Sequence, residues 1–229
     1  ADAVISVLRR SHQTIGVASF AAEVLAAVPN DHPRVLPLHD EAGQAHLALG
    51  QIQRALTSYG IATEVTQRRA AAEPDRADYQ RDLSVSHERM GDLFRALGLG
   101  DDASKAFAAS LAIRERLVAA ERDRADYQRD LSVSHDRMGD LFRALGQGDD
   151  ARKAYAAALA ISERLVAAEP DRADYQRALS VSYDRMGDLV RALGQGDEAR
   201  KAYAAALAIS ELMVVAEPDR ADYQRDLSV

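Results

Sequence analysis

The stretch ADYQRDLSVSHDRMGDLFRALGQGDDARKAYAAALAISERLVAAEPDR, from Ala125 to Arg172, decides the fold because it is repeated. The next copy begins at Ala173, which gives a period of 173 − 125 = 48 residues, and the opening sequence ADYQRDLSV also begins at Ala77 and Ala221. In such an array each copy is one supersecondary unit, whose apolar face is buried only by its neighbours. The period therefore predicts a repeat array.

Each copy is predicted to hold two helices. Apolar side chains in its first half are spaced by four, seven, four and three residues, which places them on one face of an α-helix. In the second copy these side chains are Tyr79, Leu83, Met90, Phe94 and Leu97. Gly98 and Gly100 then provide a stop, and Asp101 and Asp102 place carboxylates at the positive end of a second helix.

Prolines and aspartates mark the joints between copies. Pro170 ends one copy, and Asp171 and Asp174 are expected to cap the first helix of the next. The second copy has Arg122 in place of this proline, so we expect a less sharply defined turn there.

The register divides the chain into segments of one predicted solenoid domain. Residues 1–31 fit the pattern least, and we expect them to form an N-terminal capping helix or a degenerate half-repeat. The other predicted segments are a diverged repeat 1 (32–76), repeats 2, 3 and 4 (77–124, 125–172 and 173–220) and the start of a further, truncated repeat (221–229).

Composition limits the kind of partner. The formal net charge is −7. Residues 125–172 hold nine acidic and seven basic side chains, which gives 7 − 9 = −2 for that copy. No basic surface accumulates, and this argues against a nucleic-acid partner. No apolar run approaches the roughly 18 residues of a membrane-spanning helix, so no membrane association is expected.

The sequence also carries expectations about its setting. It contains no cysteine, which rules out disulfides and thiolate metal sites and fits a reducing compartment, so we expect a cytoplasmic protein. It begins without methionine and stops partway through a copy, as a fragment would. Its Ala- and Arg-rich composition is compatible with a bacterial source.

One pattern of small and aromatic residues recurs in register. Gly139 is followed by a small residue after twelve positions, an aromatic after four more and another small residue after three more: Ala151, Tyr155 and Ala158. The pattern resembles the tetratricopeptide repeat (TPR), in a long variant similar to kinesin-light-chain-like and bacterial signalling arrays. The resemblance implies an all-α fold, a right-handed α-solenoid of antiparallel helix pairs (a TPR-like superhelix). The usual TPR unit has about 34 residues, so each helix is expected to be about two turns longer here.

The resemblance also implies a binding surface, because family members typically bind peptides along the concave face lined by the first helices. Opposite the apolar stripe, each first helix carries arginine, valine, two acids and arginine. The candidate partner-binding residues are Arg81, Val85, Glu88, Asp92, Arg95, Arg129, Val133, Asp136, Asp140, Arg143, Arg177, Val181, Asp184, Asp188 and Arg191. Stacked copies would align the acids between two arginine bands, and a basic or mixed-charge extended peptide is the expected ligand.

Two alternatives compete with peptide binding. Charges three residues apart, such as Asp92 and Arg95, can simply neutralise each other on a solvated face. The chain can also be a self-assembly element that stacks through its repeat ends, since Leu212 stands where the previous copy has Arg164. A following repeat would cover that same surface. If the chain binds peptides, we expect a protein-interaction scaffold, the sensing or scaffolding arm of a larger signalling protein.

No catalytic residue, cofactor or metal is expected. His32, His39 and His46 are spaced by sevens, but the last two correspond to positions that hold aromatic residues in other copies. No cysteine or convergent carboxylate completes a metal-ligand set. Recurring serines, such as Ser84 and Ser132, lack a recognisable base and oxyanion donors. The sequence therefore does not predict an enzyme.

Overall fold

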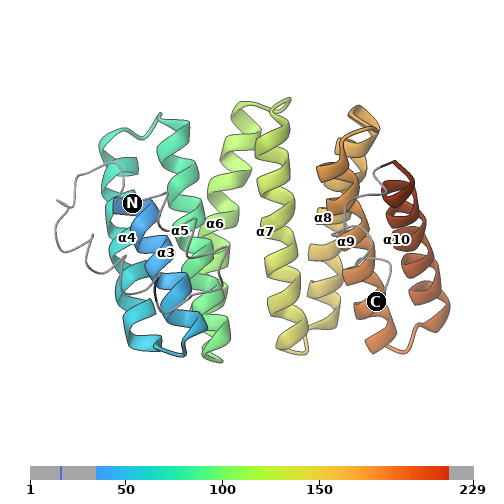
Figure 1. The fold of residues 1–229 in the computed structure, drawn as a ribbon, viewed down its shortest axis with the longest axis horizontal. Helices are drawn as coiled ribbons and strands as arrows, with labels where there is room; N and C mark the ends of the chain where they lie inside the picture. Colours follow the sequence, from blue (N-terminus) through green and yellow to red (C-terminus); the bar gives the residue numbers. More distant parts are fainter. Residues whose placement is uncertain (1–15, 17–34, 217–229) are drawn as a thin grey trace. The chain divides into compact units, whose positions relative to one another are not determined.

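The computed structural model describes Gly16 and residues 35–216, and every element between residues 35 and 216 is an α-helix. The chain divides into two compact units, Ala1–Ile113 and Arg114–Val229. The helices are α3 (Val35–Ala48), α4 (Ile52–Ala72), α5 (Ala77–Ala96), α6 (Gly100–Ala120), α7 (Ala125–Ala144), α8 (Gly148–Ala168), α9 (Ala173–Ala192) and α10 (Gly196–Ala216) (Figure 1). The all-α helical-repeat fold class is confirmed. The capping segment 1–31 and the truncated repeat 221–229 lie outside the described residues, apart from Gly16.

Glycine ends each first helix as predicted. Gly146 has φ +72°, in the left-handed region that favours glycine, and it follows α7 directly after Leu145. Its amide donates to the carbonyl of Arg143 at 3.1 Å, and the amide of Gln147 donates to Phe142 at 2.8 Å. Gly50, Gly98 and Gly194 have the same conformation. Gly100, which the sequence suggested as part of a stop, instead begins α6.

The joint before each later first helix is held by an arginine rather than by an aspartate cap. Arg172 is the N-cap residue of α9 and makes no side-chain cap hydrogen bond. Its guanidinium binds Asp174 at 2.9 Å and lies over the ring of Tyr175, 4.1 Å from the ring centroid. The same contacts form at Arg76 and Arg124. The aspartate in the first turn therefore fixes the arginine, and the arginine covers the tyrosine.

The turn that contains Arg122 is as well defined as the turn that contains proline, so the expectation of a looser turn is wrong. The amide of Arg124 donates to the carbonyl of Glu121 at 3.2 Å, and the equivalent bond between Arg172 and Glu169 has the same length. Backbone hydrogen bonds, together with the arginine contacts, are therefore enough to define this turn without proline.

The two helices of a hairpin meet where an aromatic ring lies against a helical glycine. In the second unit the ring of Tyr155 (α8) lies against Gly139 (α7), so close that a Cβ built on the glycine would be 2.5 Å from the ring. Tyr155 is 1% exposed and forms a core cluster with Ala151 and with Leu189 of α9, the next first helix. The first unit repeats the arrangement with Ala55, Tyr59 and Leu93.

This contact makes a stability prediction with an internal control. Gly139→Ala should lower the free energy of unfolding by about 2 kcal/mol, because the new methyl group overlaps the Tyr155 ring. Gly60→Ala, within α4, should raise it by about 0.5 to 1 kcal/mol, because no atom lies within 4 Å of the new Cβ and alanine favours a helix. Urea unfolding of both variants measures the difference. Equal effects would show that the ring contact does not limit the size of residue 139.

Candidate functional site

We use the name first-helix face for the side of each of the helices α5, α7 and α9 that carries the candidate partner-binding residues named from the sequence, and we describe it in each unit separately. In the second unit its valines stay at the surface, with Val133 37% and Val181 39% exposed. Three of its acids are less accessible: Asp136 is buried at 7% exposure, and Asp140 and Asp188 are half-buried, whereas Asp184 is exposed. In the first unit Glu88 is buried as well.

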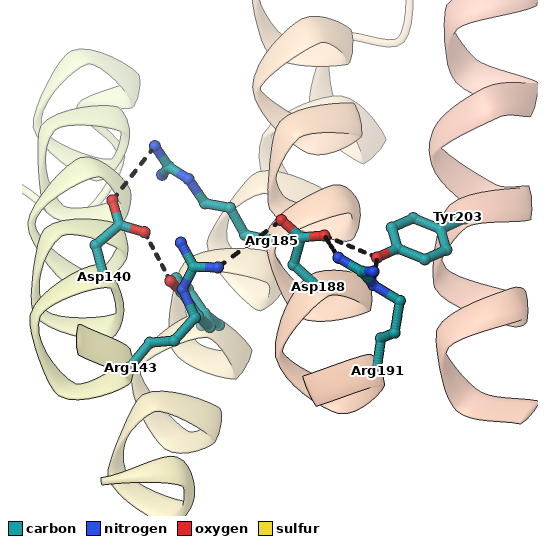
Figure 2. Close-up of polar contacts among 7 residues, drawn as sticks. Asp140, Arg143, Arg185, Asp188, Arg191 and Tyr203 are labelled. Carbon is teal, nitrogen blue, oxygen red and sulfur yellow. Dashed lines mark hydrogen bonds and ion pairs between the residues drawn. The ribbon is translucent and has the colours of Figure 1, made fainter. Parts of the chain in front are cut away.

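The acids of α7 are in contact with an arginine that sequence reasoning did not select. Arg185 of α9 places Nη1 2.6 Å from Asp136 Oδ2. Its Nη2 lies 3.8 Å from Asp140 Oδ2 (Figure 2). Arginine occupies the equivalent positions 89 and 137, so recurrence was a signal that could have identified it. It was missed because it lies between the apolar stripe and the chosen polar side of the helix.

The second acid of each pair also belongs to the scaffold. The Tyr155 hydroxyl donates to Asp140 at 2.6 Å, and the Tyr203 hydroxyl donates to Asp188 at 2.8 Å. Arg143 Nη1 lies 3.9 Å from Asp188 Oδ2, which adds a link between α7 and α9 (Figure 2). Burial and the hydrogen bond to Asp140 raise the pKa of Tyr155. Asp136, Asp140 and Asp188 of the predicted acidic band are thus built into helix contacts in this unit.

Beside these acids a groove of about 500 Å³ lies between α7 and α9, with α8 contributing to its lining. We call it the α7–α9 groove. Its lining residues are Arg129, Ser132, Val133, Asp136, Arg137, Ser162, Leu165, Ala173, Asp174, Arg177, Ala178, Val181 and Arg185. Two serine hydroxyls of the lining link α7 to α8, since the Ser132 and Ser162 oxygens lie 3.2 Å apart.

The first unit has an equivalent groove of about 410 Å³, the α3–α5 groove. It is lined by Leu36, Pro37, Asp40, Glu41, Gln44, Ala62, Thr66, Arg69, Asp82, Val85, Ser86 and Arg89. Nine of these positions (36, 37, 40, 41, 66, 69, 82, 85 and 89) lie two periods, 96 residues, before lining positions of the α7–α9 groove. The groove is therefore a product of the repeat and not an accident of one helix pair.

Nine of the ten predicted residues of the second unit separate into two sets, and exposed Asp184 belongs to neither. In the second unit Arg129, Val133, Asp136, Arg177 and Val181 line the groove. Asp140, Arg143 and Asp188 instead make the contacts between helices shown in Figure 2, together with Arg191. In the first unit only Val85 of the predicted set lines a groove. The face thus combines recognition positions with positions that hold the fold.

Between residues 35 and 216 no group of three or more His, Cys, Asp or Glu side chains is placed to hold a metal ion. Burial lowers the pKa of His39, His87 and His135, which favours their neutral form. None of the helices that the structure describes is long and apolar enough to cross a bilayer.

Asp136 gives a pH prediction. Burial raises its pKa from 3.8 to about 6, although Arg185 opposes the rise. Near pH 5 the folded chain therefore keeps a proton on Asp136, whereas the unfolded chain, in which the pKa of Asp136 is lower, has released it. This protonation stabilises the fold at low pH, and the stabilisation is lost as the pH rises through 6. Protonation of Asp136 should add about 1 kcal/mol to the free energy of unfolding between pH 7 and pH 5.

The buried histidines act in the opposite direction, so the measurement compares wild type with Asp136→Asn. Urea unfolding at pH 5 and pH 7 should show that the wild type gains about 1 kcal/mol more stability on acidification than the variant does. An identical pH dependence in the two proteins would contradict the assignment to Asp136.

Comparison with known proteins shows which solved structures have a similar fold. No protein-family model and no curated protein matches the sequence. The crystal structure of BtubC (BKLC) from P. vanneervenii is similar, with 16% identity and a TM-score of 0.70 over 91% of this chain and 78% of that one. TPR-like repeats of a kinesin light chain from Podosopora anserina match with 19% identity and a TM-score of 0.60 over 93% of each chain. The chain therefore has the TPR-like helical-repeat fold that the resemblance implied.

Proposed function

We propose that the chain is a non-catalytic protein-interaction scaffold that binds an extended peptide of a partner protein along its first-helix face. The observation that carries the proposal is the groove that recurs at equivalent positions in both units. A volume of about 410 to 500 Å³ accommodates a few side chains, and it lies at the lower end of the range for ligand sites. A site repeated at the period of the scaffold suits a ligand that is itself extended.

The chemistry of the groove also fits a peptide. Val133 and Val181 offer exposed apolar surface on α7 and α9, and Arg129 and Arg177 are exposed beside them. Apolar contact provides affinity, and arginine provides orientation by binding carboxylates or carbonyl groups. A mixed-charge peptide is the proposed ligand. In a larger signalling protein such a module would serve as the sensing or scaffolding arm.

A second candidate function is self-assembly through the last helix. Leu207 and Leu212 of α10 are 47% and 65% exposed, whereas Leu159 of α8, which is equivalent to Leu207, is half-buried. Exposed leucines on one helix favour burial against another surface. A second copy of the chain would meet this need at a place distinct from the groove.

Two double variants separate the candidates. Val133→Ser with Val181→Ser should weaken peptide binding about tenfold, because it removes apolar contact from the groove, and it should leave the association state unchanged. Leu207→Ser with Leu212→Ser should do the reverse under the second candidate function. Selection of displayed random dodecapeptides on the wild-type chain supplies the ligand, fluorescence anisotropy measures its affinity, and sedimentation measures association.

The results decide between the two functions. Tight peptides that bind both double variants equally would contradict the first-helix face as the site. Failure of selection to enrich any peptide, together with wild-type association that the leucine variant abolishes, would favour self-assembly instead.

A further inference from the structure

The two equivalent grooves carry opposite net charge. The α7–α9 groove is lined by four arginines and two aspartates, which gives 4 − 2 = +2. The α3–α5 groove is lined by three acids and two arginines, which gives 2 − 3 = −1. The charged residues are Arg129, Arg137, Arg177, Arg185, Asp136 and Asp174 in the first case, and Asp40, Glu41, Asp82, Arg69 and Arg89 in the second.

Three substitutions at equivalent positions account for part of the contrast. Arg137 corresponds to Glu41, and Ala178 corresponds to Asp82, so both changes make the α7–α9 groove more positive. Leu165 corresponds to Arg69, and this change makes the α7–α9 groove less positive by one charge. The shared part of the groove, including the arginine at 89 and 185, stays the same.

The acids of the α7–α9 groove are already in contact with guanidinium groups. Asp136 lies 2.6 Å from Arg185, on the opposite helix of the groove. Asp174 lies 2.9 Å from Arg172 and 3.8 Å from Arg129. A cationic ligand would have to displace these arginines, whereas an anionic ligand can be added to them. The lining of this groove as a whole carries a net positive charge.

We infer that the α7–α9 groove binds a carboxylate side chain of an acidic segment in the partner protein and that the α3–α5 groove does not. The guanidinium group presents paired donors that match a carboxylate, and exposed Arg177 is positioned on α9 one turn before Val181. The valines contact the aliphatic part of the segment, and the groove holds only a few side chains. This inference rests on the proposed peptide-binding function and adds the charge that each groove selects.

Sequences selected from the random dodecapeptide library give the first test. Peptides enriched on the wild-type chain should contain more Asp and Glu than the input library, and this excess should disappear on Arg177→Glu. Arg200→Glu is the matched control, because it makes the same charge change at an exposed position on α10, outside both grooves. Its selected peptides should keep the acidic excess.

A double-mutant cycle then tests direct contact. The most enriched acidic peptide and its Glu→Gln counterparts are measured by anisotropy against the wild type, Arg177→Glu and Arg200→Glu. The acidic peptide should bind Arg177→Glu about tenfold more weakly than wild type, and loss of the peptide carboxylate should cost about tenfold on wild type but little on Arg177→Glu.

The failures can be told apart. Selected peptides without an acidic excess, or a carboxylate effect that is equal on wild type and Arg177→Glu, would overturn the charge assignment. If those peptides still depend on Val133 and Val181, the proposed peptide-binding function survives. Enrichment of no peptide at all would overturn both.

Discussion

The contact between an aromatic ring and a helical glycine holds each hairpin together, and the stacking of hairpins within a unit depends on it. The Tyr155 ring lies where any side chain at Gly139 would overlap it, and the Tyr155 hydroxyl donates to the neighbouring Asp140. Leu189 of the next first helix then packs on the same ring. One side chain therefore fixes the distance between two helices and forms the surface on which the third one packs.

This arrangement gives the polar side of the first helix two tasks. Asp140 and Asp188 hold tyrosine hydroxyls, and Arg185 reaches back from α9 to Asp136 and Asp140. Because these groups are half-buried or buried, their contacts are screened less by solvent than surface pairs are. A charge reversal at Asp140 would therefore disturb the scaffold as well as any ligand. Recognition is better assigned to exposed groups in the groove lining, such as Val133 and Val181.

The sequence predicted the repeat period, the helical hairpins, the glycine that ends each first helix and the all-α fold class, because these depend on local spacing and on recurrence. It did not predict that Arg185 contacts Asp136, since these residues are 49 positions apart and periodicity alone does not say which neighbouring helix a long side chain reaches. The grooves were not predicted either. The α7–α9 groove is lined by residues of three helices, α7, α8 and α9, so it depends on how these helices pack and not on a local motif.

In a repeat protein, the positions at which the copies differ determine how the binding specificity of one copy differs from that of another. Residues 125–172 and 173–220 differ only at positions 130/178, 135/183, 142/190, 150/198, 164/212, 165/213 and 167/215, and one of these differences, Asp130 to Ala178, removes a negative charge from the groove lining. The diverged first copy keeps the groove but places Glu41 where Arg137 stands. Packing positions such as Gly139 cannot vary without loss of stability, whereas lining positions can. Divergence at lining positions such as 137 and 178 changes the charge of a groove while the glycine and aromatic packing positions stay the same.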